Sequence, residues 1–283
     1  MKVLIDEKIV NRHEVRVDIE DRGYQFGDGV YEVINVYDGV PFTLREHIAR
    51  LYRSATEIGL LINVEPEKLM HDILRVIQAN DMKNGGLYLQ FSRGVAPRTH
   101  QYQTDIKPLL VAYPLPYKEM THAQAIGVPA ITKEDLRWLR CDIKSLNLLY
   151  NVMMKQKAFE VGAFEAILIR DDVVTEGTSS NVFMVKNKII YTHPVNNLIL
   201  NGITRTKLLQ LFQENGWDYK EQTFTKQELF DADEVFVTST TSEVVPVISI
   251  DGVAVNTGKP GSLTKEIQLA FSEMVKKETT QKA

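Results

Sequence analysis

Two prolines in one short segment divide the sequence. Pro114 and Pro116 stand in the run Tyr113-Pro114-Leu115-Pro116-Tyr117-Lys118. Each proline lacks a backbone N–H donor and fixes its own φ, so neither a helix nor a central strand is expected to continue through both. A chain of 283 residues is also long enough to build two hydrophobic cores. We therefore expect two domains, residues 1–116 and 122–283, joined by a linker at residues 117–121.

Strand and helix patterns are mixed on both sides of this linker. Before it, Thr43 is a candidate N-cap, Pro66 suits a first helical turn, and Asp38-Gly39 indicates a hairpin. The spacing of apolar residues predicts strands at residues 2–5, 8–10, 30–37, 87–92 and 109–113, and helices at 44–58 and 66–80. After it, strands are expected at residues 166–169, 181–185, 188–191, 234–237 and 244–250, with helices at 145–161, 204–215 and 263–275. The tail from Lys276 is expected to fray.

Charge and cysteine content exclude several classes of protein. The formal net charge of -4 and the pI of about 5.9 leave no broad basic surface, so nucleic acid is not an expected partner. The single cysteine, Cys141, excludes an intrachain disulfide and is expected to be a small buried hydrophobe in a reducing compartment. Charges interrupt the first eight residues, and no apolar run reaches the roughly 20 residues of a membrane span. We expect a cytoplasmic protein without a membrane segment.

The first candidate for chemistry is Lys144. It lies in the segment Arg137 to Asn147, where three cations occur in a stretch that otherwise has the pattern of a buried strand. Neighbouring positive charge and desolvation both disfavour the ammonium form, and a neutral amine is what Schiff-base chemistry requires. A solvated lysine in a salt-bridge cluster is the alternative, and the local sequence does not decide between them.

The second candidate is Glu176, which precedes a run of small polar residues between two apolar strands. A strand exit of this kind can line a polar site, although a surface hairpin is an equally good reading. Two further segments, 200–205 and 237–243, offer backbone N–H groups and hydroxyls. A glycine beside a helix N-terminus favours phosphate binding, while ordinary capping explains each segment alone. Taken together, a lysine, a carboxylate and two anion-binding loops match the needs of a phosphorylated aldehyde cofactor.

These segments resemble the fold-type IV pyridoxal-phosphate enzymes. The resemblance extends over nearly the whole chain and is carried by the segments Asp21 to Glu32, Arg140 to Asn147, Thr175 to Asn181, Gly202 to Arg205 and Thr238 to Glu243. Within this family the chain is more similar to D-amino-acid aminotransferases than to branched-chain aminotransferases or aminodeoxychorismate lyases. The discriminating segment runs from Ser92 to Gln101, where Arg98 and His100 resemble a trap for the substrate carboxylate. The resemblance implies an α+β fold, with a smaller N-terminal α/β sandwich and a larger C-terminal pseudo-barrel domain with helices.

The resemblance also implies roles for individual residues. Lys144 would bind pyridoxal 5'-phosphate as a Schiff base and act as the catalytic base, and Glu176 would face the pyridine nitrogen. Arg50 would clamp the cofactor phosphate in bidentate fashion, unless it is an ordinary surface charge on its helix. The remaining expected cofactor contacts are Ile203, Thr204, Thr240, Ser239, Ser179 and Leu200, and the expected substrate contacts are Tyr31, Arg98, His100 and Trp138. For Tyr31 a structural role is the alternative, and for Arg98 and His100 a solvated turn. No metal site is expected.

The activity implied is amino transfer between D-amino acids, such as D-alanine and D-glutamate, and 2-oxo acids, such as pyruvate and 2-oxoglutarate. A homodimer is implied as well, because in the family the arginine and histidine reach into the neighbouring subunit's site. Three alternatives stay open: a branched-chain L-amino-acid aminotransferase, an enzyme like aminodeoxychorismate lyase, and a catalytically silent metabolite-binding protein on the same fold.

Overall fold

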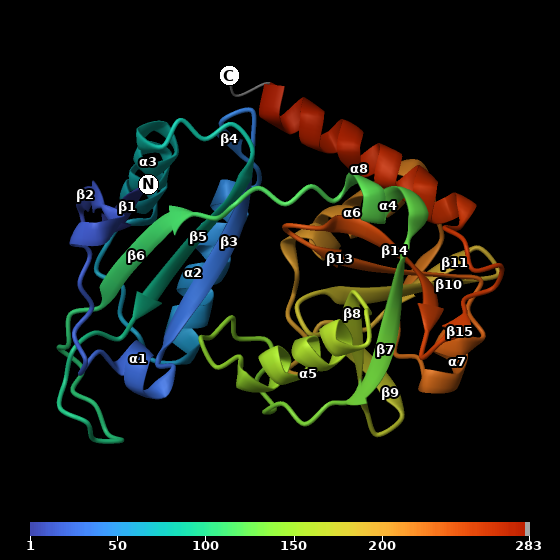
Figure 1. Cartoon of the computed structure of the whole chain (residues 1–283), viewed down its shortest axis with the longest axis horizontal. Helices are drawn as coiled ribbons and strands as arrows, with labels where there is room; N and C mark the ends of the chain where they lie inside the picture. The colour runs from blue at the N-terminus through green and yellow to red at the C-terminus, as the bar shows by residue number, and fades with distance from the viewer. Residues whose placement is uncertain (281–283) are drawn as a thin grey trace. The chain divides into compact units, whose positions relative to one another are not determined.

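The computed structural model describes residues 1–280, which form two compact units (Figure 1). Unit 1 contains Met1–Lys118, Ile143–Asn147 and the residues from Lys277, and unit 2 contains Glu119–Asp142 and Leu148–Lys276. The sequence-based linker at 117–121 stays a prediction. The contact-based units differ from it because the chain returns to unit 1 at Ile143–Asn147, the segment that carries Lys144.

Unit 1 is built on an antiparallel sheet covered by helices. Its six strands lie in the order β2-β1-β6-β5-β3-β4, and every pair is antiparallel. The strands are β1 (Lys2–Ile5), β2 (Lys8–Asn11), β3 (Gly29–Tyr37), β4 (Val40–Pro41), β5 (Gly85–Ser92) and β6 (Leu109–Pro114). The helices are the short η1 (Arg12–Glu14) and α1 (Arg22–Phe26), and the longer α2 (Leu44–Glu57) and α3 (Pro66–Ala79). The predicted hairpin at Asp38-Gly39 is confirmed, because β3 pairs with β4 across it.

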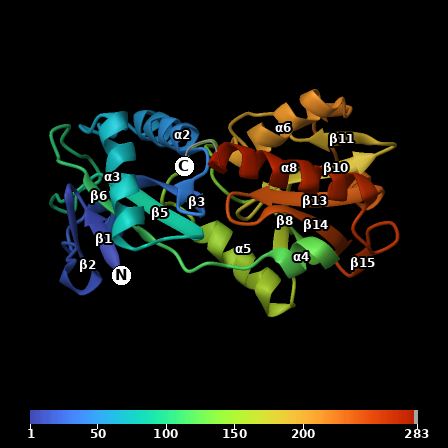
Figure 2. The ribbon, with the colours of Figure 1, turned by 90° about the horizontal axis from the view of Figure 1, so that it is seen from above.

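The core of unit 1 lies between the sheet and the helices α2 and α3, which Figures 1 and 2 show beside the strands. Along β3 the buried positions alternate with half-buried ones, as expected for a strand with one face on a core. Val30 and Ile34 on β3 belong to the same cluster as Leu51 on α2 and Ile73 on α3. The apolar periodicity seen in the sequence therefore sets which face of each element is buried.

Unit 2 is built on a nine-stranded mixed sheet. Eight strands follow the order β12-β11-β10-β13-β14-β7-β8-β9, and β15 pairs with β14. The strands are β7 (Val128–Glu134), β8 (Glu165–Arg170), β9 (Val173–Gly177), β10 (Asn181–Lys186), β11 (Ile189–Thr192), β12 (Tyr219–Glu221), β13 (Glu234–Ser239), β14 (Glu243–Ile250) and β15 (Val253–Ala254). The helices are α4 (Thr121–Ile126), α5 (Leu149–Glu160), α6 (Ile203–Asn215), α7 (Lys226–Phe230) and α8 (Ser262–Thr280). The pairs β11–β12, β14–β7 and β7–β8 are parallel.

The connection from β9 to β10 shows that this sheet curls. β9 is the last strand on the hydrogen-bonded path and β10 is the third from the other end, yet only a short turn joins them. In that turn the Gly177 N–H donates to the Ser180 carbonyl at 2.7 Å. Strands that are distant on the path but adjacent in the chain require strong curvature, which agrees with the expected pseudo-barrel.

Several local expectations differ from the structure. The segment from Arg137 to Asn147 is irregular rather than a strand, and the predicted helix at 145–161 begins only at Leu149. Before that helix, the Leu146 N–H donates to the Gly29 carbonyl at 3.0 Å, so the backbone is occupied in pairing with β3. Thr43 stands at the N-cap of α2, but its hydroxyl donates to the Phe42 carbonyl and does not cap the helix. The tail beyond Lys276 continues α8 to Thr280 instead of fraying there, and the last three residues of the predicted frayed tail lie outside the described residues.

Candidate active site

Backbone hydrogen bonds fix Lys144 beside strand β3 in unit 1. The Tyr31 N–H donates to the Lys144 carbonyl at 3.0 Å, and the Lys144 N–H donates to Ser54 Oγ at 3.2 Å. The Lys144 Nζ lies 4.2 Å from the centroid of the Tyr31 ring. Two residues predicted for the site, Lys144 and Tyr31, are therefore in contact, and the half-buried amine has a defined position.

A buried ion cluster lies on the same strand. Glu32, which is fully buried, accepts from Arg50 Nε at 2.7 Å and from Arg50 Nη2 at 2.8 Å. It also faces His47 Nδ1 at 2.7 Å. Burial by itself would raise the pKa of Glu32, but the charge and hydrogen bonds of Arg50, with those of His47, hold it at about 2. Burial lowers the pKa of His47, so this imidazole is neutral at neutral pH and donates its Nδ1 proton to Glu32.

The position of Arg50 excludes the alternative of a surface charge. This arginine is buried on the core face of α2, so it is not an ordinary surface charge. Glu32 already occupies Nε and Nη2 of the guanidinium, and it holds the guanidinium in one orientation. The bidentate contact of Arg50 with a cofactor phosphate stays a prediction.

The low pKa of Glu32 predicts a specific pH dependence of stability. Its unfolded value is 4.5 and its folded value about 2, so between these values the unfolded chain binds more protons and the free energy of unfolding rises with pH. Lowering the pH from 6.5 to 3.5 should remove about 1 kcal/mol of Glu32's contribution to the free energy of unfolding. Urea titrations at the two pH values should show a smaller loss in Glu32→Gln than in wild type. The exposed control Glu67→Gln should lose as much as wild type, and equal losses in all three proteins would refute the prediction.

Arg98 and His100 lie together in the loop that follows β5. Both side chains are exposed on the described chain. The guanidinium of Arg98 lies 5.0 Å from the centroid of the Phe26 ring, and the His100 ring lies 5.9 Å from the same ring. Phe26 therefore gathers the two predicted substrate residues on one side of α1. The loop has no regular structure and both side chains are exposed, as the solvated-turn alternative expects, and their role in substrate binding stays a prediction.

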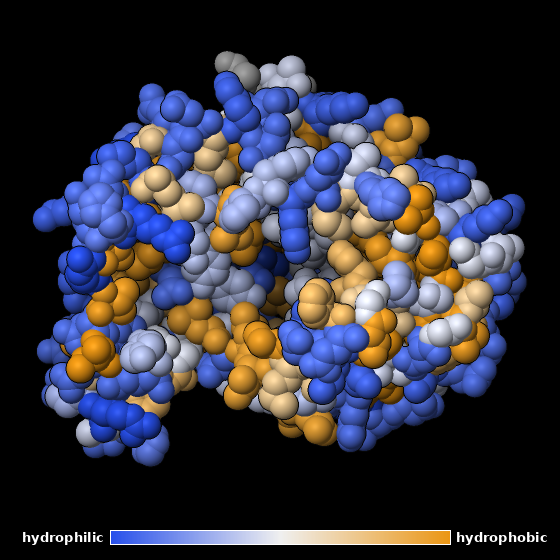
Figure 3. All heavy atoms as spheres, viewed as in Figure 1, coloured by the Kyte–Doolittle hydropathy of each residue, from blue (hydrophilic) through white to orange (hydrophobic). Residues whose placement is uncertain are grey.

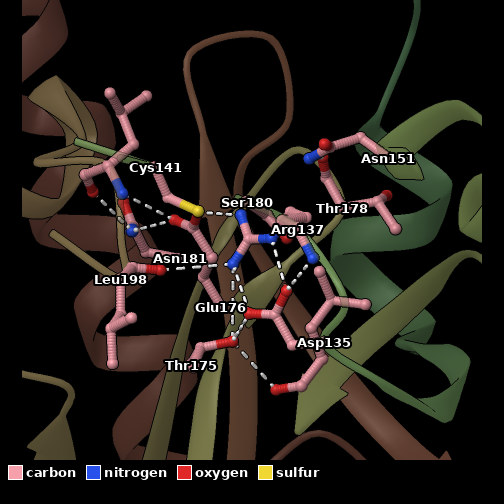
Figure 4. Close-up of polar contacts among 12 residues, drawn as sticks. Asp135, Arg137, Cys141, Asn151, Thr175, Glu176, Thr178, Ser180, Asn181 and Leu198 are labelled. Atoms are coloured by element: carbon pink, nitrogen blue, oxygen red, sulfur yellow. Dashed lines mark hydrogen bonds and ion pairs between the residues drawn. The ribbon is translucent and has the colours of Figure 1, made fainter. Parts of the chain in front are cut away.

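In unit 2, Glu176 is held in a buried polar network (Figure 4). Arg137 Nη1 donates to Glu176 Oε1 at 2.5 Å, and Arg137 Nη2 donates to Asp135 Oδ2 at 2.8 Å. On its other oxygen, Glu176 accepts from the Leu200 N–H at 3.0 Å and from Asn181 Nδ2 at 3.2 Å. The surface-hairpin reading of Glu176 is therefore wrong: each carboxylate oxygen has a donor inside the protein.

Electrostatics keep this carboxylate ionised at neutral pH. Burial raises the pKa of Glu176 to about 6, although Arg137 and the Leu200 N–H act in the opposite direction. For Asp135, burial alone would raise the pKa, but hydrogen bonds from Arg137 and Thr175 and the charge of Arg137 lower it to about 2. Glu176 thus remains mostly a carboxylate above pH 6 and can favour a protonated heterocyclic nitrogen.

The sequence argument from crowded cations around Lys144 is not supported. Arg137 is neutralised by Asp135 and Glu176, and Arg140 Nε lies 3.0 Å from Asp142 Oδ1. Each arginine of the segment therefore has its own carboxylate. Spacing along the sequence could not reveal this, because Glu176 lies 39 positions from Arg137.

Two loops of unit 2 provide donors for an anion. Gly202 is the N-cap of α6, a helix of 13 residues. Since glycine has no side chain, no side-chain group caps the backbone amides of Ile203 and Thr204 at the start of this helix. A Cβ on Gly202 would collide with Asn181 Oδ1, so only glycine allows this close approach. After β13, the Ser239 and Ser242 hydroxyls lie 2.6 Å apart and order the turn that contains Thr240.

The other predicted residues of unit 2 have less defined positions. The Leu200 carbonyl accepts from Asn181 Nδ2 at 2.9 Å, which fixes Leu200 beside Glu176. Ser179 is exposed in the turn between β9 and β10, and Trp138 is also exposed. Their predicted contacts with cofactor and substrate remain predictions. Cys141 is buried as expected, and burial raises the pKa of its thiol to about 11.

Several polar residues with buried partners were missed by the sequence reasoning. Besides Glu32 and Asp135, they include the buried Glu165, whose carboxylate accepts from the Thr178 N–H at 3.2 Å and from Ser180 Oγ at 2.8 Å. It thereby supports the turn that carries Ser179. The sequence did contain a signal for two of these residues. Glu32 and Glu165 are carboxylates in strands with buried apolar neighbours, where a charged group requires a partner.

The donor set of unit 2 fits a phosphorylated pyridine cofactor: a buried ionised carboxylate, a helix N-terminus without a side-chain cap and a hydroxyl-rich turn. A model of the amino-transferase class IV family matches residues 29–250, which is more than half of the chain. This chain belongs to the class IV aminotransferases. Like the rest of its class, this aminotransferase uses pyridoxal 5'-phosphate.

This class IV aminotransferase is similar to two curated relatives in sequence and to one solved structure in fold. It is 58% identical to a D-alanine aminotransferase of Bacillus licheniformis, over 99% of both chains. It is 48% identical to a D-alanine aminotransferase of Staphylococcus epidermidis, over 97% of this chain and 98% of that one. The branched-chain amino acid aminotransferase of Escherichia coli superposes with a TM-score of 0.92 at 26% identity, covering 97% of this chain and 94% of that one. The expected fold-type IV architecture is confirmed.

Proposed function

We propose that this class IV aminotransferase transfers amino groups between D-amino acids of the D-alanine and D-glutamate type and 2-oxo acids such as pyruvate and 2-oxoglutarate. One observation carries the proposal: 58% identity to a D-alanine aminotransferase along 99% of both chains. The branched-chain enzyme has a similar backbone but only 26% identity, so the shared fold does not favour its substrates.

In this proposal Lys144 is the catalytic residue. When bound, pyridoxal phosphate supplies an electron sink for the electrons of the broken Cα–H bond. Lys144 would hold the cofactor through its amine, and the same amine would take the proton from the substrate's α-carbon. The contacts of Lys144 with Tyr31 and Ser54 support this role because they fix where the amine is attached.

Glu176 is proposed to hold a proton on the pyridine nitrogen. Its ionised carboxylate, supported by Arg137 and the Leu200 N–H, is suited to pairing with a cation. Ile203, Thr204 and Thr240, with Arg50, are proposed to bind the phosphate, and Ser179, Ser239 and Leu200 to line the cofactor. The α6 N-terminus supports this assignment because its amides and helix dipole favour an anion.

The side chains of Tyr31, Arg98 and His100 are proposed to bind the substrate carboxylate, with Trp138 near the substrate. If the carboxylate is fixed on one side, only one enantiomer can direct its α-hydrogen at Lys144 and still fit its side chain. The exposure of Arg98 and His100 supports the further proposal that they enter the site of a second subunit.

A panel of D- and L-amino acids tests this function most directly. Purified protein is incubated with 2-oxoglutarate and each amino donor, and the glutamate formed is resolved by chiral chromatography. The proposal predicts D-glutamate from D-alanine and little product from L-alanine, L-leucine or L-valine. Only L-glutamate, formed from branched-chain donors, would favour the branched-chain alternative. Pyruvate release without net amino transfer would indicate a lyase.

An apolar stripe on α5 supports the proposed homodimer. Leu149, Val152, Met153 and Phe159 occupy one side of this helix and are between 50% and 76% exposed. Hydrophobic side chains are visible on the surface around this helix (Figure 3). Contiguous exposed apolar surface of this kind is typical of a protein interface, and a second copy of the chain is the proposed partner.

A charge placed in this stripe should weaken the dimer. Val152→Glu is expected to increase the dimer dissociation constant by roughly 10-fold or more, because an unpaired carboxylate would be desolvated in the interface. Sedimentation velocity over a concentration series measures the change. Leu269→Glu, at a residue of α8 that is 63% exposed, is the matched control and should behave as wild type. An unchanged dissociation constant for Val152→Glu would place the interface elsewhere.

We also propose a cytoplasmic location. The single cysteine cannot form an intrachain disulfide, and its thiol is buried with Sγ donating to the Trp138 carbonyl. Among residues 1–280, no helix is long and apolar enough to span a bilayer.

A further inference from the structure

Arg22 connects α1 to the loop that carries Arg98 and His100. It is the first residue of α1 and only 3% exposed. Its Nη1 donates to the Thr99 carbonyl at 2.7 Å, and its Nη2 donates to the His100 carbonyl at 3.2 Å. One buried guanidinium therefore binds two consecutive carbonyls in the proposed carboxylate-binding loop.

Asp28 holds this guanidinium in place. Its Oδ2 accepts from Arg22 Nε at 2.9 Å and from Arg93 Nε at 2.8 Å. Arg93 in turn donates to the carbonyls of Ile58 and Gly59 at 2.8 and 2.9 Å. Through Asp28 and Arg93, the Arg22 side chain is thus connected to the backbone just after β5 and at the end of α2.

Aromatic rings complete the connection on both sides of the loop. The Arg93 guanidinium lies 3.6 Å from the centroid of the Tyr102 ring, two residues after His100. The Arg22 guanidinium lies 4.8 Å from the centroid of Phe26, the ring that also faces Arg98 and His100. Planar stacking and forked donation together require arginine, because a lysine ammonium cannot make both kinds of contact at once.

We propose that Arg22 is a positioning residue for substrate recognition, and this inference rests on the proposed role of Arg98 and His100. Arg22 does not touch the substrate. By fixing the Thr99 and His100 carbonyls, it sets the direction of the two side chains before the substrate's carboxylate arrives. Without it the loop would pay the ordering entropy on binding, and carboxylate recognition would weaken.

A double-mutant cycle separates positioning from general structural support. The four holoenzymes are wild type, Arg22→Met, Arg98→Ala and the double variant, each assayed with D-alanine and 2-oxoglutarate. Arg22→Met should lower kcat/KM by roughly 10- to 100-fold, mainly through KM, with the visible cofactor band retained. In the Arg98→Ala background the same change should cost clearly less than in wild type, about 3-fold, because one of the two side chains that Arg22 positions is already gone. Arg75→Met, on α3, is the control and should match wild type.

Arg22→Lys provides a second test that keeps the positive charge beside Asp28. Compared with Arg22→Met, the Arg22→Lys variant should recover more of the wild-type melting temperature than of the wild-type KM. The reason is that one lysine ammonium cannot bind both carbonyls as the guanidinium does. Equal losses from Arg22→Met in both backgrounds, or no loss in the wild-type background, would overturn the positioning role alone. If Arg98→Ala itself leaves kcat/KM unchanged, the proposed carboxylate site fails, and this inference fails with it.

Discussion

Lys144→Ala is expected to abolish nearly all transamination, with a fall in kcat of at least roughly 10³- to 10⁴-fold. In the proposed mechanism this variant would lose two functions of Lys144 at once, the attachment of the cofactor and the proton transfer at the substrate's α-carbon. The variant should also lack the visible band that borohydride removes from the wild-type protein. Coupled assays of D-alanine with 2-oxoglutarate and absorption spectra before and after borohydride measure both effects.

The control for this variant is another lysine of the same chain. Lys157 is exposed on α5, and its Nζ lies 2.9 Å from Glu160 Oε2. Because such a surface ion pair contributes little, Lys157→Ala should leave both the turnover and the visible absorption band unchanged. Added methylamine should restore part of the proton transfer to Lys144→Ala if the missing group is an amine. Turnover near the wild-type rate in Lys144→Ala would show that a different lysine does the chemistry.

Arg98→Ala is expected to give the second largest loss, about 2–5 kcal/mol in kcat/KM, or roughly 30- to 5,000-fold. Arg98 is exposed in the described chain. In the proposed site, however, the substrate carboxylate would be desolvated, and in Arg98→Ala it would lack its cationic partner. Steady-state kinetics with D-alanine and with 2-oxoglutarate should both show the loss, since each substrate carries the carboxylate.

A conservative variant and a surface arginine sharpen this experiment. Arg98→Lys should recover only part of the loss, because an ammonium lacks the fork that binds both carboxylate oxygens. Arg45→Ala removes a 76% exposed arginine side chain of α2 and should change kcat/KM by less than about 2-fold. A wild-type kcat/KM in Arg98→Ala would exclude this residue from substrate binding.

Much of the fold could be predicted from local pattern. The alternation in β3 and the helical period in α2 and α3 gave these elements to within about two residues, because each has one apolar face against a core. Segments whose structure depends on distant partners were not predicted. Ile143–Asn147 pairs with β3 over more than 110 positions, and no local pattern encodes that contact.

The candidate site divides in the same way. Lys144 and Glu176 could be proposed from the resemblance, and the packing of Tyr31 against Lys144 fits that proposal. The role of Arg22 could not, because the two carbonyls that it binds lie 77 and 78 positions away. For Glu32 a signal existed: it shares the buried phase of β3 with Val30 and Ile34, where a carboxylate requires a cationic partner.

Covalent mapping of the cofactor is the decisive test of Lys144 as the residue that holds pyridoxal phosphate. The purified protein is loaded with pyridoxal phosphate, reduced with borohydride, digested and analysed by peptide mass spectrometry. We expect a phosphopyridoxyl group on the peptide that contains Lys144. An adduct on a peptide without this residue, or no adduct at all, would contradict it.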